Sequence, residues 1–100
     1  MLWAISCVDK PNSAAARAAV LQTHRDYLQT KKGILVIAGP TQTDDGEQAV
    51  GSLFVLNVNS RAEAKAFSDG DPFTQAGVFA SITISRMRKG QWNPEAAEGA

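Results

Sequence analysis

The chain has 100 residues, which is the usual size of one domain and too short for two. Its ten basic and ten acidic side chains cancel, so we expect neither nucleic acid nor anionic lipid as a partner. The single cysteine, Cys7, excludes an internal disulfide and is interpreted as a small buried hydrophobe. Residues Met1–Ser6 lack the charges of a secretory signal, and no apolar run reaches transmembrane length, so we expect a cytoplasmic protein.

The apolar runs in the first half of the chain predict two strands. Leu2–Val8 is apolar on both alternations, which is typical of a strand covered on both faces. Ile34–Ala38 is a continuous β-favouring run that Gly39 and Pro40 are expected to stop. Its simplest interpretation is a buried strand in the middle of a sheet. A polar turn or flexible loop is expected over Thr41–Ala49.

Between these strands, Ala14–Lys32 predicts a long helix, because it is rich in helix-forming residues and contains no Gly or Pro. The expected buried stripe of this helix consists of Ala14, Ala18, Leu21 and Leu28. Arg17 and His24 lie two turns apart at the edge of that stripe. A histidine at a core border is commonly structural, but it is also the side chain that exchanges protons near neutral pH. The local sequence leaves both interpretations open.

The second half predicts strand, helix and strand. Val50–Val58 is the third expected strand. Ser60 and Glu63 fit a capping box at the start of a helix that ends at Gly70, where a left-handed glycine is expected. Val78–Ser85 alternates in polarity and predicts a fourth strand, which the following residues up to 89 could extend.

The resulting β-α-β-β-α-β order predicts an α+β, ferredoxin-like sandwich with a four-stranded antiparallel sheet and helices on one face. The other face is expected to carry some of Trp3, Ile5, Cys7, Phe54, Leu56 and Phe79. Because such a face is too apolar to leave in water, we expect a homodimer joined through it. Residues 1–90 form the predicted domain, and residues 91–100 an expected disordered tail.

The RNA-recognition motif has the same element order, but its third strand needs exposed aromatic side chains and basic neighbours. Here that strand contains Phe54 as its one aromatic residue and has no Lys or Arg, which argues against RNA. The sequence also lacks a phosphate-binding glycine loop, a CxxC pair and a clustered metal-ligand pattern. We therefore expect no cofactor and no metal.

The loop between the second helix and the last strand has a distinctive composition. Pro72 disfavours the helical region for Asp71, so the carboxylate should project from an extended residue, and Phe73 should anchor the loop. An ordered acid there suits a functional site, although on local sequence alone an ordinary Asp-Pro turn is the simpler interpretation. The helix before Asp71 should pack beside the helix that carries His24. A carboxylate bonded to an imidazole would fix its tautomer.

Several short motifs follow one another along the chain. They are Arg17, His24, Ala38-Gly39-Pro40, Gly51-Ser52, Asp71-Pro72-Phe73 and Ala76-Gly77-Val78. In this order and spacing the chain resembles the YciI family, also called YCII-related proteins, from about Met1 to Lys89. The resemblance implies a dimeric ferredoxin-like α+β fold, similar to muconolactone isomerase and other dimeric α/β-barrel proteins. It further implies a proposed histidine–aspartate active site, here His24 and Asp71. Most members have no assigned function, and one relative is a dehydrochlorinase acting on a chlorinated hydroxyquinol.

Two functions follow as hypotheses. In the first, the chain is a lyase or isomerase acting on a cyclic or carbonyl-bearing small molecule, with His24 moving a proton and Asp71 orienting the imidazole. Arg17 would hold an anionic or phenolate oxygen, unless it is a solvated helix charge. Ser52 would hydrogen-bond the ligand, and Phe73 would form a wall of the pocket or part of the core. In the second hypothesis, the same dimeric scaffold is a non-catalytic ligand-binding or assembly module.

Overall fold

The computed structural model describes all 100 residues. Its elements follow in the order β1 (Leu2–Asp9), α1 (Ala14–Thr30), β2 (Leu35–Gln42), β3 (Ala49–Asn57), α2 (Arg61–Gly70), α3 (Pro72–Gln75), β4 (Phe79–Met87) and the 3-10 helix η1 (Pro94–Ala97). The predicted α+β class and the predicted β-α-β-β-α-β order are confirmed. Two short helical segments are additions: α3, a single turn where the sequence indicated only a loop, and η1, which lies within residues 91–100.

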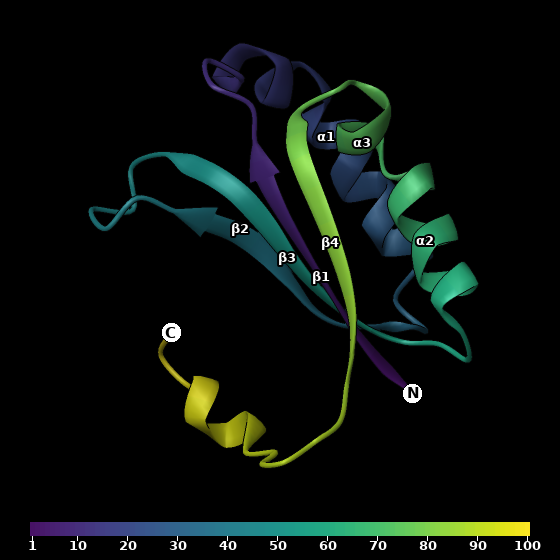
Figure 1. Cartoon of the computed structure of the whole chain (residues 1–100). Coiled ribbons are helices and arrows are strands. Elements are labelled where there is room, and N and C mark those ends of the chain that lie inside the picture. The colour runs from purple at the N-terminus through teal and green to yellow at the C-terminus, as the bar shows by residue number, and fades with distance from the viewer.

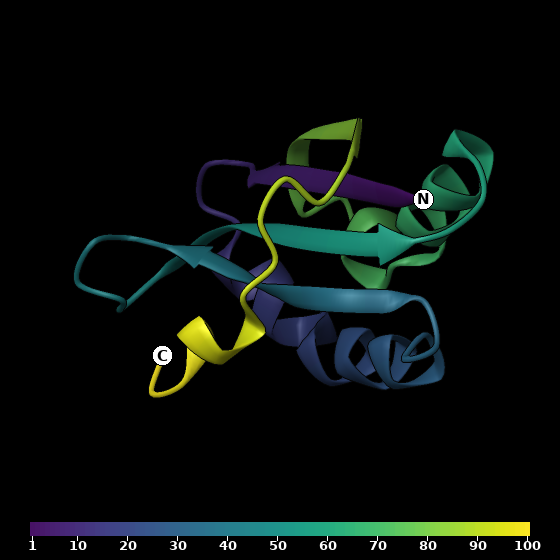
Figure 2. The same cartoon turned by 90° about the horizontal axis from the view of Figure 1, so that it is seen from below.

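The four strands form one antiparallel sheet in the order β2-β3-β1-β4. Helices α1, α2 and α3 all lie on the same side of this sheet (Figure 1). Figure 2, seen from below, shows β1 and β3 side by side, with β2 on the far side of β3. The predicted ferredoxin-like arrangement is therefore correct. No helix is both long and apolar enough to cross a membrane.

The second strand is not central, as its apolar run predicted, but forms one edge of the sheet. β2 pairs with β3 alone, and it continues through Gly39 and Pro40 to Gln42. A proline is tolerated there because an edge strand leaves one side of its backbone unpaired, so the missing N–H costs no ladder hydrogen bond. Ile37 is 59% exposed, as an edge position allows.

The core lies between the sheet and the helices. It contains Trp3, Ile5, Cys7, Phe54, Leu56, Val58, Ala64, Phe67, Phe73, Val78 and Phe79. All six residues that were considered for the opposite face belong to this core, so that part of the prediction is wrong. The predicted stripe of α1 is also partly wrong, because Ala14 and Ala18 are exposed and only His24 of this helix is buried. Alanine side chains are too short to reach the sheet where the start of α1 overhangs a cleft.

The open face of the sheet also carries apolar side chains, on β1, β2 and β3, while β4 contributes hydroxyl side chains to it. Directly opposite residues of an antiparallel pair share a face, and Ser6 pairs with Leu53, Ala4 with Val55. Val8 and Leu53 on this face are 55% and 42% exposed. Beyond β4 the chain leads away from the helices (Figure 1), and Trp92 is 56% exposed. The disorder expected for residues 91–100 stays a prediction.

Gly51 and Gly70 are required by close packing, and Gly77 is required by its positive φ. The left-handed residue of this region is Gly77, with φ of 72°, and not Gly70 as predicted. Gly70 ends α2, where a Cβ atom would lie 2.6 Å from the Tyr27 hydroxyl oxygen of α1. At Gly51 the neighbouring strand β1 comes close, since a Cβ there would overlap the Cys7 carbonyl oxygen. Gly70 thus lets α1 pack tightly against the end of α2.

Candidate functional site

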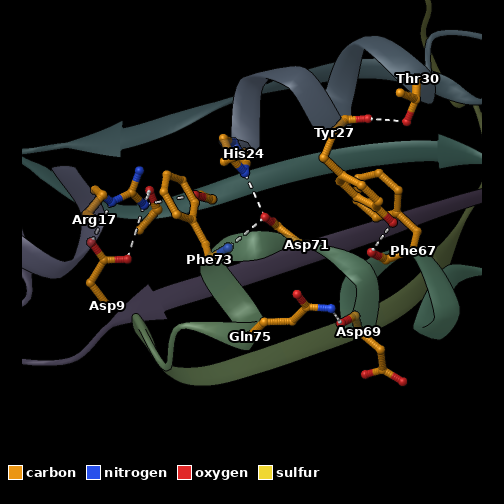
Figure 3. A network of polar contacts seen from close by, with 12 residues as sticks. Asp9, Arg17, His24, Tyr27, Thr30, Phe67, Asp69, Asp71, Phe73 and Gln75 are labelled. Carbon is orange, nitrogen blue, oxygen red and sulfur yellow. Dashed lines mark hydrogen bonds and ion pairs between the residues drawn. The ribbon is translucent and has the colours of Figure 1, made fainter. Parts of the chain in front are cut away.

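A buried histidine–aspartate pair joins the middle of α1 to the junction of α2 and α3. His24 Nδ1 lies 2.7 Å from Asp71 Oδ1 (Figure 3), and their side chains are 10% and 2% exposed. As predicted, Pro72 leaves Asp71 extended, with φ of −66° and ψ of 125°. Asp71 is also the N-cap of α3, because its Oδ1 accepts a hydrogen bond from the Phe73 backbone N–H at 2.9 Å.

The hydrogen bonds of the pair determine which nitrogen of the imidazole is available. An ionised carboxylate only accepts, so the ring must donate its Nδ1–H to Asp71. In the neutral ring the lone pair is then on Nε2, which makes no hydrogen bond within the protein. The second oxygen of Asp71, Oδ2, is buried and has no partner. The carboxylate therefore binds the imidazole at Nδ1 and leaves Nε2 without a partner.

Phe73 positions both members of the pair. Its ring stacks on the His24 imidazole, with 3.8 Å between centroids and 14° between planes. The Arg17 guanidinium carbon lies 4.5 Å from the centroid of the same ring, so Phe73 separates two cationic or ionisable groups (Figure 3). The ring edge of Phe54 completes the surroundings of the histidine, at 6.2 Å. The ring of Phe73 is buried, and it also lines a cavity, so it serves both core and site.

Arg17 is held by a polar network and is not a solvated helix charge. Its side chain is 11% exposed, and its Nε donates to Asp9 Oδ2 at 2.9 Å. Its Nη2 contacts Asp9 Oδ1 at 3.2 Å, the Gly51 carbonyl oxygen at 2.7 Å and Ser52 Oγ at 2.9 Å. Its Nη1 has no protein acceptor. The guanidinium is therefore oriented on one side and keeps two N–H donors available on the other.

Asp9 is the residue of this network that sequence reasoning missed. The available signal was an acid directly after an apolar strand and eight positions before Arg17, but nothing in the sequence indicates that β1 ends beside the first turns of α1. Phe54 was also missed as a neighbour of the histidine, although its burial was considered.

Two cavities meet at this site. The inner cavity, of about 190 Å³, is lined by four predicted site residues: Arg17, His24, Ser52 and Phe73. Asp71 does not line it and lies behind the imidazole. The outer cleft, of about 720 Å³, lies between the loop after β1 and the β2–β3 turn. The structure contains no group of three or more His, Cys, Asp or Glu side chains that could hold a metal ion.

The fold and site define a ferredoxin-like α+β domain with a buried histidine–aspartate pair beside a cavity. The family model for the YCII-related domain matches residues 1–88 of the sequence, so the chain belongs to the YCII-related family. It is 30% identical over 96 residues to protein YciI of Escherichia coli O6:H1, covering 89% of this chain and 98% of that one. An uncharacterized protein of Haemophilus influenzae is 28% identical over the same shares of the two chains.

Among solved structures, a similar chain is 5-chloro-2-hydroxyhydroquinone dehydrochlorinase (TftG) from Burkholderia phenoliruptrix AC1100. Its TM-score is 0.83 at 32% identity, covering 90% of this chain and 96% of that one. That structure is a complex with 2,5-dihydroxybenzoquinone. An antibiotic biosynthesis monooxygenase, with a TM-score of 0.51 and 16% identity over 88% and 97% of the chains, shows a likeness of fold alone.

Cys7 lies in the core close to both acids of the site. Burial, and then the charges of Asp71 and Asp9, raise the pKa of its thiol from 9.0 to about 12, while the charge of Arg17 opposes them. Burial also raises the pKa of Tyr27, with a further contribution from Asp71. The thiol is therefore protonated near neutral pH and is no nucleophile there.

We expect the raised pKa of Cys7 to make stability depend on pH in the alkaline range. Between pH 9 and about 12 the unfolded chain has lost a thiol proton that the folded chain retains. The free energy of unfolding should therefore fall as pH rises, by at most about 1.4 kcal/mol per pH unit. Urea unfolding from pH 8 to 11 at one protein concentration measures this fall in the free energy of unfolding. The Cys7→Ala variant should lack this component while keeping that of Tyr27, and equal slopes in the two proteins would contradict the assignment.

Proposed function

We propose that the chain is a small-molecule enzyme of the lyase or isomerase type in which His24 transfers the proton. The observation that carries the proposal is the orientation of the imidazole. Asp71 occupies Nδ1 at 2.7 Å, and the unpartnered Nε2 belongs to a side chain that lines the inner cavity. A free imidazole nitrogen at a cavity, held from behind by a carboxylate, is the arrangement of a general acid–base catalyst.

In the proposed reaction His24 Nε2 takes a proton from a hydroxyl group, or from a carbon beside a carbonyl group, of the bound molecule. The electron pair left behind moves into the ring of the substrate. In an elimination, this pair forms a double bond to the adjacent saturated carbon and expels a leaving group such as chloride from it, and the imidazolium then releases its proton to solvent. In an isomerisation, the imidazolium returns the proton at another carbon. Asp71 stabilises the imidazolium formed in between. A positioned acid–base group of this kind contributes about 10²–10⁴-fold to the rate.

The negative charge that develops on a substrate oxygen needs donors, and Arg17 supplies them. Its free Nη1 hydrogens lie on a guanidinium that is already oriented by Asp9, so little reorganisation is needed when the charge forms. The hydroxyl of Ser52, which accepts from Arg17, still has its own hydrogen to donate to the ligand. Phe73 forms a flat wall of the cavity.

The similarity to TftG supports a planar, oxygen-rich ring as the substrate class. That relative is named for a chlorinated hydroxyhydroquinone and binds a dihydroxybenzoquinone. The inner cavity is small and bounded by aromatic rings, which suits one flat ring whose oxygen atoms face Arg17 and Ser52.

We expect His24→Gln to lower turnover of chlorinated hydroxyquinols or dihydroxyquinones by about 10²–10⁴-fold, since Gln cannot exchange the proton. Asp71→Asn should lower turnover in the same direction, because the imidazole would lose its orienting carboxylate. Product formation by absorbance or mass spectrometry measures the loss. Thr23→Ala, an exposed neighbour on α1, serves as the matched control and should retain activity.

Full activity in a folded His24→Gln protein would end the enzymatic proposal. The non-catalytic alternative has its own signature in the same experiment. A compound of the panel would then raise the melting temperature of the wild-type protein, and none would be converted.

We also propose that the chain forms a homodimer through the open face of the sheet. The support is the exposure of apolar side chains on that face. They include Val8, Ile37 and Leu53, each of which is more than 40% exposed. Contiguous apolar surfaces of this kind are typical of interfaces, and a two-fold dimer covers the same patch on both copies.

We expect Leu53→Lys to convert this dimer to a monomer, because each copy would have to bury a lysine charge in the interface. Analytical ultracentrifugation measures the mass, and circular dichroism checks that the variant is folded. Ala66→Lys, on the exposed side of α2, is the control and should stay dimeric. A wild-type protein that is monomeric at micromolar concentration, or a dimeric Leu53→Lys protein, would contradict the proposal.

A further inference from the structure

The inner cavity and the outer cleft adjoin each other. They share four lining residues, Arg17, Leu21, Arg25 and Pro40. The inner cavity, at about 190 Å³, is smaller than the roughly 300–1,000 Å³ of ordinary small-molecule sites, whereas the adjoining outer cleft, at about 720 Å³, falls in that range. A ligand that fills the site therefore extends beyond the ring compartment at His24 and enters the outer cleft.

Arg25 lies at the junction and has no charged partner. It follows His24 directly on α1, and it lines both spaces. Its neighbours at helical spacing, Leu21, Gln22, Leu28 and Gln29, include no acid. The adjacent Asp26 accepts instead from Gln22 Nε2 at 2.9 Å. The guanidinium of Arg25 makes no ion pair or hydrogen bond in the structure.

The other charges around the outer cleft do not neutralise Arg25. Asp9 is bound to Arg17, so this acid is already paired. Glu47, on the β2–β3 turn, lines the cleft but is not within ion-pair distance of any cation. Lys10 also lines the cleft and contributes a further positive charge. Arg25 thus lines both spaces and has a guanidinium whose N–H donors are free to bind an anionic group.

We propose that Arg25 is a specificity residue that binds a carboxylate carried by the substrate outside its reacting ring. This inference rests on the proposed function, since it places the ring at His24 and Arg17. The substrate class becomes an oxygenated ring, or an open carbonyl compound of similar size, with a short acidic side chain. A guanidinium binds a carboxylate through two parallel hydrogen bonds, which suits this role better than a lysine.

Binding of two probes that differ only in charge tests the proposal without requiring turnover. The probes are 2,5-dihydroxyphenylacetate and the corresponding neutral amide, titrated by calorimetry at low ionic strength. The wild-type protein should bind the carboxylate about tenfold more tightly or better. Arg25→Gln should lose this preference with unchanged affinity for the amide. Lys32→Gln, which removes a charge outside both spaces, should keep the preference.

A wild-type protein that binds the two probes equally, or does not bind the carboxylate in the millimolar range, would overturn the inference. So would a preference that survives in Arg25→Gln. The outcome is separable from that of the catalytic proposal. A carboxylate preference that depends on Arg25 would stand even if no compound were converted, and loss of turnover in His24→Gln without such a preference would leave only the catalytic proposal.

Discussion

The site depends on one hydrogen bond, from the Nδ1–H of His24 to Oδ1 of Asp71, which joins α1 to the α2–α3 junction across the core. Three local features make it possible. Gly70 lets α1 approach the end of α2 without a clash at Tyr27. Pro72 keeps Asp71 out of the helix, so that its carboxylate is free to cap α3 and to face α1. Phe73 then stacks on the imidazole that the carboxylate holds.

An ion pair or hydrogen-bonded pair with a buried acid lies on each side of Phe73. On one side Asp71 holds His24, and on the other Asp9 holds Arg17. In each pair a buried acid occupies one end of a planar nitrogen-containing group and leaves the far nitrogen, Nε2 or Nη1, without a protein partner. A buried base or acid without its partner would be strongly destabilising, so the pairs also account for how these groups are tolerated in the core. The result is a proton-transfer group and an oxygen-binding group in fixed positions on one small cavity.

Much of this arrangement could be predicted from the sequence, because local rules decide it. The element order follows from apolar runs and capping signals, and the extended Asp71 follows from Pro72. The edge position of β2 and the facing of β1 could not be predicted, since both faces of these strands are apolar and alternation gives no sign of which one meets the helices. The partnership of Asp9 with Arg17 was missed for a related reason: it depends on where β1 ends relative to α1, which is a property of the folded chain.

The most direct test of this account is the position of the hydrogen on the His24 imidazole. Long-range nitrogen–proton NMR spectra of the folded protein, recorded at a pH where the ring is neutral, distinguish the two tautomers. The account predicts a hydrogen on Nδ1, bonded to Asp71, and an unprotonated Nε2. A neutral ring with its hydrogen on Nε2 would contradict it, because the nitrogen at the cavity could then not accept a proton.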